Sequence, residues 1–331
     1  MVVLLNCYYY TTIQQFNNTT IQIMTFHANG KLLLTGEYFV LDGATALALP
    51  TKVGQSLFIE HEPEIHGEDL FWCSVTPVGS PWYSALFQMP NPFVKIWDGT
   101  VDFSEGLIKA FEAIEKLKPN FWEDKKGMSL TTNLEFPHNW GLGSSSTLIW
   151  LLAKWANIDP FALNDLTFGG SAYDIACAGA RKPIFFERKN NTPIYTEVDF
   201  KPPFADNLYF VFLNQKQNSR EGIARYREKA KNLPPQYFDD ILALTNGFYT
   251  ATNLLDFEKL IVEHEALVAS VIELPRAKSL YFNDLWGQIK SLGAWGGDFV
   301  LATSDRSFEK TKRYFEEKGF DTILKYNDLI L

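Results

Sequence analysis

The spacing of hydrophobic residues along the chain predicts both strands and helices. Between Phe26 and Leu49, apolar runs alternate with glycine turns, which predicts a strand, a turn and a second strand, and residues 55–62 keep the same β character. From Asp102 to Leu117, apolar residues recur at helical spacing, so this segment is predicted to be a helix with Asp102 or Ser104 as its N-cap.

The rest of the chain continues this alternation. A strand is predicted at residues 127–136, and it leads into the stretch "HNWGLGSSSTLIWLLAKW", which runs from His138 to Trp155 and is apolar nearly all round from Thr147 onward, as a buried helix would be. The second half predicts strands at 183–188, 208–214, 297–304 and 322–331, and helices at 219–233, 237–251, 253–272 and 306–319. The chain is therefore predicted to be α+β, with a β-rich first half and a helix-rich second half.

Composition narrows the possible classes of protein. The chain has 331 residues, 46% of them hydrophobic, which is typical of a folded globular protein with two lobes. A net charge of −9 argues against nucleic-acid binding, and no apolar run reaches the roughly 20 residues that span a bilayer. Cys7, Cys73 and Cys177 show no CxxC or metal-ligand spacing, which favours reduced thiols in a cytoplasmic protein.

The first thirty residues contain no charged side chain and lack the features of a signal peptide. We predict that residues 1–25 are disordered or a non-native extension, with Met24 as the natural start, although an added strand is an alternative. Two domains are predicted beyond it, at residues 26–190 and 191–331.

The glycine–serine stretch has the chemistry of an anion cradle. The first N–H groups of a helix have no intrahelical partner, glycine lets the backbone approach a ligand, and the helix dipole favours negative charge. Ser144, Ser145 and Ser146 add hydroxyls for phosphate or magnesium. The alternative is structural, because a serine N-cap before a buried helix is common. Neither the Walker loop, which needs a Lys, nor the dinucleotide fingerprint, whose last glycine is replaced by Ser146, fits the stretch.

Three segments in the same order resemble those of the GHMP kinases, the superfamily of galactokinase, homoserine kinase, mevalonate kinase and phosphomevalonate kinase. They are "NGKLLLTGEYFVLDGATALALP" (Asn29 to Pro50), the stretch from His138, and "LGAWGGDFVLAT" (Leu292 to Thr303). Within the superfamily, "GKLLLTGEY" and "GGSAYDIACAG" look most like phosphomevalonate and mevalonate kinases.

The resemblance implies a two-lobed fold, ATP and Mg²⁺ as cofactors, and roles for particular residues. Asp174, in "SAYDIA", matches the catalytic Asp, and Lys31 matches the Lys that would keep it ionised and stabilise developing charge. Without the resemblance, Asp174 would be a helix cap and Lys31 an exposed residue at a strand start. The nucleotide would contact Gly141, Leu142, Gly143, Ser144, Ser145, Ser146 and Thr147, and Ser145 matches the serine that contacts magnesium, with its two neighbours as alternatives.

Substrate contacts are assigned less directly. Glu37 and Tyr38 match the Gly-Glu-Tyr element near the acceptor, and residues 214–222 open a helix with basic groups. The expected acceptor-binding residues are Glu37, Tyr38, Ser171, Lys216, Ser219, Gly296 and Gly297. Arg181, Lys182 and Arg220 are further basic candidates for a phosphorylated acceptor.

The chain departs from the family pattern in several places. Trp295 stands where a glycine is usual, which predicts either a narrower pocket or a turn of different shape. No Glu lies between Gly141 and Asp174, so magnesium would have fewer protein ligands, with only Asp159 and Asp165 in that interval. His138 is a candidate nucleotide contact or a surface residue.

The sequence therefore predicts an ATP- and Mg²⁺-dependent small-molecule kinase acting on phosphomevalonate or mevalonate, in isoprenoid precursor synthesis, with a homodimer as a possible assembly. The alternatives are a sugar or homoserine kinase of the same fold, and a non-catalytic sensor that binds ligand without turnover. The hypothesis of an NAD-dependent oxidoreductase rests only on the dinucleotide fingerprint, which the sequence does not match.

Overall fold

The computed structural model describes residues 23–61, 67, 69–100, 102–215 and 219–331. The chain forms two compact units, each built from separate stretches of sequence. Unit 1 comprises Met1–Asn29, Val53–His138 and Gly143–Gly179, and unit 2 comprises Gly30–Lys52, Asn139–Leu142 and Ala180–Leu331. This division is more interleaved than the single cut predicted after residue 190, because the chain passes between the units at five points.

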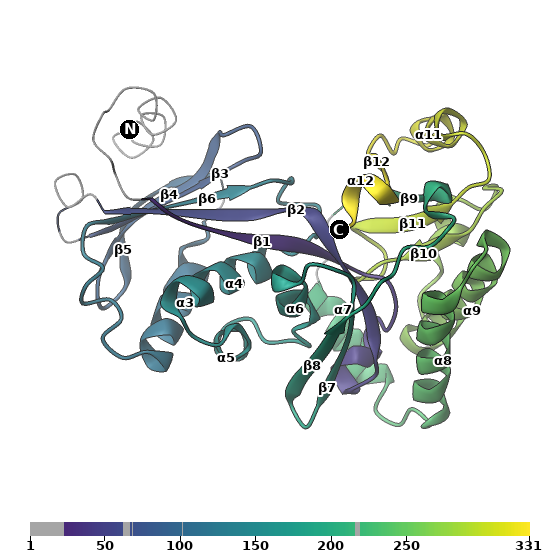
Figure 1. Ribbon diagram of the computed structural model, residues 1–331, viewed down its shortest axis with the longest axis horizontal. Coiled ribbons are helices and arrows are strands. Elements are labelled where there is room, and N and C mark those ends of the chain that lie inside the picture. The colour runs from purple at the N-terminus through teal and green to yellow at the C-terminus, as the bar shows by residue number, and fades with distance from the viewer. Residues whose placement is uncertain (1–22, 62–66, 68, 101, 216–218) are drawn as a thin grey trace. The chain divides into compact units, whose positions relative to one another are not determined.

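Unit 1 is a sheet covered by helices. Its strands run in the order β5 (Phe93–Gly99), β4 (Pro81–Gln88), β3 (Leu70–Val75), β6 (Met128–Leu134) and β2 (Ala46–His61), and β1 (Met24–Leu33) also pairs with β2. Neighbouring strands along this path are antiparallel except β3 and β6, which are parallel. The helices α3 (Ser104–Leu117), α4 (Ser144–Ala156), α5 (Pro160–Leu166) and α6 (Tyr173–Gly179) gather on one face of this sheet (Figure 1).

The two longest helices of unit 1 bury different amounts of their surface. In α3 the residues Leu107, Ala110, Phe111, Ala113 and Ile114 form one buried face at helical spacing, and the opposite face is more exposed. In α4 the apolar residues between Leu148 and Ala156 are buried on nearly all sides, which fits the prediction of a helix inside the core. Aromatic residues of the sheet and its flanking loops, among them Trp72, fill the space beside them.

Unit 2 contains a four-stranded antiparallel sheet in the order β10 (Ile289–Ser291), β11 (Phe299–Thr303), β9 (Leu208–Phe212) and β12 (Ile323–Lys325). Its helices are α7 (Ser219–Lys229), α8 (Gln236–Thr250), α9 (Leu254–Ile272), α10 (Ala277–Tyr281), α11 (Phe308–Glu316) and α12 (Tyr326–Leu329). The helices α8 and α9 lie side by side, away from α11 (Figure 1). The first residues of β2 pair with β7 (Ile184–Lys189), which pairs with β8 (Thr192–Glu197). Two 3-10 turns, η1 (Phe39–Asp42) and η2 (Ala205–Asn207), complete the unit.

The structure confirms the α+β class and most of the predicted elements, with local corrections. The helix predicted from Asp102 begins at Ser104, with Phe103 in the N-cap position, and the Asp102 carboxylate accepts the Ser104 N–H at 2.9 Å. The strand predicted at 322–331 ends at Lys325, because the chain then turns into α12. The strands β3, β4 and β5 were not predicted, since their residues between 70 and 99 follow no single alternating pattern.

Three further expectations concern the chain as a whole. The predicted N-terminal extension mostly lies outside the described residues, and its last two residues, Met24 and Thr25, belong to β1, in agreement with the alternative of an added strand there. Cys177 is a buried thiol outside any disulfide, whereas Cys73 is disulfide-bonded, so the prediction of reduced thiols is wrong for Cys73; spacing in sequence cannot show which sulfur atoms meet. In the described part of the chain, no helix has the length and apolarity needed to cross a bilayer.

Candidate active site

The start of α4 in unit 1 carries the serines of the glycine–serine stretch. Gly143 holds the N-cap position with φ of 93°, in the left-handed region that glycine adopts without strain, and no side chain caps the helix. The N–H of Thr147 bonds to the carbonyl of Gly143 at 2.9 Å, so the regular helical ladder begins there. The N–H groups of the preceding serines therefore lie in the first turn, where a helix has donors to offer an anion.

The four hydroxyls of this turn divide into two pairs. Ser146 Oγ donates to the carbonyl of Gly143 at 2.8 Å, and Thr147 Oγ1 donates to Gln55 Oε1 at 2.7 Å; both side chains are buried. Ser144 is half-buried and Ser145 is exposed, and neither hydroxyl bonds to any residue that the structure describes. The resemblance favoured Ser145 with its two neighbours as alternatives, and in the structure the hydroxyls of Ser144 and Ser145 are the two without a bond to the described chain.

In unit 2, Lys31 is fixed beside the first glycine of the same stretch. Its backbone N–H bonds to the carbonyl of Leu142 at 2.9 Å, and its Nζ donates to the carbonyl of Gly141 at 2.8 Å. These bonds join two motif segments that are 110 residues apart in the sequence. The ammonium of Lys31 is half-buried and held in one place, as a group that must meet a phosphate at a defined position requires.

Asp298, from the third motif, also lies against Gly141. A Cβ on Gly141 would lie 2.2 Å from the Asp298 carboxylate, and Gly141 has φ of 66°, so only glycine fits there. The backbone of Asp298 is anchored by bonds to Gln215 and Leu213 at 2.9 and 2.8 Å. Asp298 was not among the predicted site residues, although it stands directly after the Gly-Gly of that motif. The three motif segments therefore meet within unit 2 at Lys31, Gly141 and Asp298.

Asp174 lies at the start of α6 in unit 1, after a tightly turned loop. Gly169, Gly170 and Ala172 all have positive φ, and for Ala172 (φ 68°) this is a strained conformation. Asp174 is half-buried, and its Oδ1 accepts the N–H of Ile175 at 3.0 Å. The side chain is thus presented at a helix start by a loop whose shape the sequence fixes with two glycines.

Glu37 forms the centre of a fully buried ionic cluster in unit 2. One carboxylate oxygen accepts from Lys290 Nζ, and the other lies 3.1 Å from His264 Nε2. Burial would raise the pKa of Glu37, but Lys290 and His264 outweigh it and hold that pKa below its ordinary value. Burial, together with Lys290, lowers the pKa of His264. Glu37 is 1% exposed, so its predicted contact with the acceptor remains a prediction, while its observed role is to anchor the loop before η1.

Tyr38 and Trp295 pack together in unit 2. The hydroxyl of Tyr38 accepts the backbone N–H of Trp295 at 2.9 Å, and its ring stacks on Tyr226 with centroids 5.7 Å apart. The Trp295 indole donates to the carbonyl of Pro275 at 2.9 Å, and Trp295 is 3% exposed. The ring of Trp295 packs in the core of unit 2, and the two outcomes predicted for the missing glycine both stay predictions.

The remaining predicted residues are dispersed. Ser171 is buried in the loop before α6, Gly296 (φ 92°) accepts a bond at its carbonyl from Gln215, and Gly297 is buried beside it. Ser219 is the first residue of α7, and Lys216 lies outside the described residues.

The other candidates are mostly held by neighbours. Lys182 pairs with Asp199 at 2.7 Å, whereas Arg181 and Arg220 are exposed. Asp159 is the N-cap of α5, and its side chain accepts the Phe161 N–H at 2.9 Å. His138 stacks on Trp82 with centroids 6.2 Å apart. The described residues contain no group of three or more His, Cys, Asp or Glu side chains arranged to hold a metal ion.

The residues at the start of α4 fit a phosphate-bearing ligand with magnesium. The N–H groups of its first turn can bond phosphate oxygens, and the hydroxyls of Ser144 and Ser145 are oxygen ligands of the kind that magnesium accepts. Because Mg²⁺ keeps several waters, it needs only one or two protein ligands.

Comparison with known proteins finds similar folds among solved structures. No protein-family model and no curated protein matches the sequence. Among solved structures, the mevalonate kinase of Methanococcus jannaschii matches with a TM-score of 0.65 at 16% identity, over 93% of this chain and 98% of the other.

Two further solved structures match at a similar level. The Streptococcus pneumoniae phosphomevalonate kinase, in complex with phosphomevalonate and AMPPNP, has a TM-score of 0.64 at 15% identity, over 92% and 100% of the two chains. Lactococcus lactis galactokinase, complexed with galactose, has a TM-score of 0.69 at 16% identity, over 97% of both. The resemblance noted in three short motifs extends over more than nine-tenths of the chain, which has the fold of the GHMP kinases.

Proposed function

We propose that the chain is an ATP-dependent phosphotransferase that phosphorylates mevalonate or phosphomevalonate in the cytoplasm. The observation that carries the proposal is the meeting of the three motif segments: Lys31 is bonded to the Gly141–Leu142 backbone, and Asp298 fills the space beside Gly141. The fold of mevalonate, phosphomevalonate and galactose kinases supports it independently.

Asp174 is the proposed catalytic base. Phosphoryl transfer requires the acceptor hydroxyl to be oriented and to lose its proton, and a carboxylate at a helix start is suited to both. The strained turn at Ala172 supports this role, since backbone strain of this kind is typical of functional sites. Lys31 supplies a fixed positive charge that stabilises the charge developing on the transferred group.

The triphosphate of ATP is proposed to bind the first turn of α4. The Ser144 and Ser145 hydroxyls and the backbone N–H groups of that turn are its expected contacts, whereas Ser146 and Thr147 position the turn through their internal bonds. Ser145 remains the expected magnesium contact, with Ser144 as its alternative. Magnesium, when bound, neutralises negative charge on the phosphates.

The acceptor follows from the resemblance of "GKLLLTGEY" and "GGSAYDIACAG" to mevalonate and phosphomevalonate kinases. A phosphorylated acceptor needs basic groups, and Arg181, Lys182, Lys216 and Arg220 are the candidates. Glu37 and Tyr38 are buried in unit 2, and they are proposed to hold in place the residues that bind the acceptor.

The test is ADP release by the purified chain with ATP, Mg²⁺ and a panel of mevalonate, phosphomevalonate, homoserine and galactose. Turnover with one of the first two acceptors, above the ATPase rate without acceptor, is the expected result. Turnover only with homoserine or galactose would replace the proposed acceptor. Nucleotide binding without turnover on any acceptor would favour a sensor that retains the fold.

A further inference from the structure

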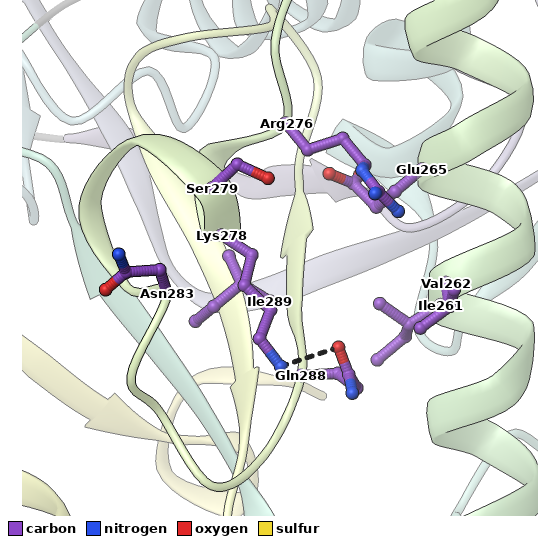
Figure 2. A pocket seen from close by; sticks show the side chains of 9 residues that line it. All are labelled: Ile261, Val262, Glu265, Arg276, Lys278, Ser279, Asn283, Gln288 and Ile289. Carbon is purple, nitrogen blue, oxygen red and sulfur yellow. Dashed lines mark hydrogen bonds between the residues drawn. The ribbon is translucent and has the colours of Figure 1, made fainter.

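Unit 2 contains a pocket that none of the residues assigned to catalysis lines. It has a volume of about 320 Å³ and opens between α9, α10 and β10, with nine residues around it (Figure 2). None of the nine was predicted to bind nucleotide or acceptor. Figure 2 shows Lys278, Ser279 and Asn283 on one side and the α9 residues Ile261 and Val262 on the other.

Two cations line the polar side of this pocket. The guanidinium of Arg276 makes no hydrogen bond or ion pair with any residue that the structure describes, and it is half-buried. Lys278 Nζ donates to the carbonyl of Gly287 at 2.6 Å and to Gln288 Oε1 at 2.9 Å. An ammonium has three protons to donate, so the positioned amine of Lys278 retains one for a ligand.

The neutral donors and the acidic residue of the pocket are also compatible with an anionic ligand. Because Gln288 Oε1 is occupied by Lys278, the donor end of that amide is the free one, and Ser279 and Asn283 are exposed at the opening. Glu265 is already satisfied, since its two oxygens accept from the N–H and Oγ of Ser291 at 2.9 and 3.2 Å. Burial raises the pKa of Glu265 to about 7, against the opposing effect of Lys290, so its repulsion of an anion is reduced near neutral pH.

We propose that this pocket binds a small organic anion, with a phosphate or carboxylate head between Arg276 and Lys278 and a short aliphatic part against Ile261 and Val262. Arginine suits such a head because its planar donors pair with two oxygens at once. The apolar wall gives the aliphatic part a surface to bury. Ser291, which holds Glu265, directly follows Lys290, the partner of Glu37, so the pocket and the N-terminal motif are attached to the same strand.

The proposal is tested by isothermal titration calorimetry of the full chain with n-butyl phosphate, inorganic phosphate, butyrate and n-butanol. Titrations are repeated with saturating ADP, so that binding at the proposed nucleotide site is separated from binding at this pocket. We expect n-butyl phosphate or butyrate to bind in both conditions, inorganic phosphate to bind more weakly than n-butyl phosphate, and n-butanol not to bind.

Variants then locate the site. Arg276→Gln should weaken the organic anion at least tenfold, and Val262→Asp, a change at an exposed position that places negative charge at the apolar wall, should weaken it as well. Arg306→Gln, at a surface arginine beside Asp305, is the matched control and should leave binding unchanged. The proposal is overturned if no anion binds with ADP present, or if Arg276→Gln and Val262→Asp both bind as the wild type does. Equal affinity for inorganic and butyl phosphate would overturn the assignment of the apolar wall.

Discussion

The start of α4 and the cluster around Glu37 both come from motif segments, yet they use their polar groups in opposite ways. At α4, the hydroxyls of Ser144 and Ser145 make no bond within the described chain. Around Glu37, both carboxylate oxygens face charged or polar neighbours, and the side chains of Lys290 and His264 are fully buried.

This difference separates residues that meet a ligand from residues that hold a loop in place. A buried carboxylate without its partner would carry a large desolvation cost, so Glu37 can keep its charge only while Lys290 remains. Exposed serine hydroxyls are solvated by water, so their removal should affect a ligand and leave the fold intact. A shared motif therefore does not imply a shared role.

The largest expected effect is on the stability of unit 2. Lys290→Met leaves the Glu37 carboxylate buried beside His264 alone, and we expect a loss of about 3–5 kcal/mol in the free energy of unfolding. Urea unfolding followed by circular dichroism measures it. The double variant Glu37→Leu/Lys290→Met should recover part of the loss, and Lys182→Gln, which breaks the exposed pair with Asp199, should change stability little. An unfolding curve for Lys290→Met that coincides with that of the wild type would contradict a stabilising cluster.

The next effect concerns the contact between Gly141 and Asp298. Gly141→Ala adds a methyl group in a left-handed conformation, which alone costs roughly 1–2 kcal/mol, and it also displaces the Asp298 carboxylate. Gly319→Ala is the matched control, because Gly319 has φ of 85° with open space around it. We expect Gly141→Ala to be the less stable of the two and also to bind ATP more weakly. Equal losses in both variants would mean that the contact with Asp298 imposes no constraint.

The two pairs of hydroxyls at the start of α4 should differ in how much they contribute to nucleotide binding. Ser145→Ala and Ser144→Ala are expected to weaken binding of Mg²⁺–AMPPNP several-fold while leaving the unfolding midpoint unchanged. Ser146→Ala removes a buried hydrogen bond to Gly143 and should lower stability by about 1 kcal/mol with a smaller effect on the nucleotide. Calorimetric titration and thermal unfolding of the three variants provide both readouts. If Ser146→Ala weakens the nucleotide most, the assignment of the hydroxyls is reversed.

A further effect is a dependence of stability on pH. The pKa of Glu265 rises from an ordinary value of 4.5 to about 7 on folding, so between these values the folded chain holds a proton that the unfolded chain has released. The contribution of Glu265 to stability therefore decreases as pH rises from 4.5 to 7 and is level above that. Lys290, Glu37 and Ser291 are the groups around it. Urea unfolding at pH 5, 6, 7 and 8 should show a shallower decline for Glu265→Gln, whereas parallel curves would refute the shift.

The sequence predicted the elements with a single clear periodicity and the residues within recognisable motifs. Both α3 and α4 were predicted because their apolar residues recur at helical spacing or surround the helix. The buried partners of Glu37 were not predicted, because His264 and Lys290 lie more than 200 residues away and only the tertiary fold brings them together.

Asp298 shows the same limit at the candidate site. It stands within a recognised motif, but its contact with Gly141 depends on how two distant loops approach each other in unit 2. The sequence could not show which serine hydroxyls bond within the chain, because the three serines of Gly-Ser-Ser-Ser differ only in position. Their bonds became clear once the helix start was placed at Ser144.

The proposed role of Asp174 is in phosphoryl transfer from ATP, and one variant tests that role most directly. Asp174→Asn keeps the size of the side chain and removes its basic carboxylate. We predict that it binds Mg²⁺–AMPPNP with nearly unchanged affinity while its acceptor-dependent ADP release falls by about 10²–10⁴-fold. Full ADP release by Asp174→Asn on an acceptor that the wild type uses would contradict the catalytic assignment.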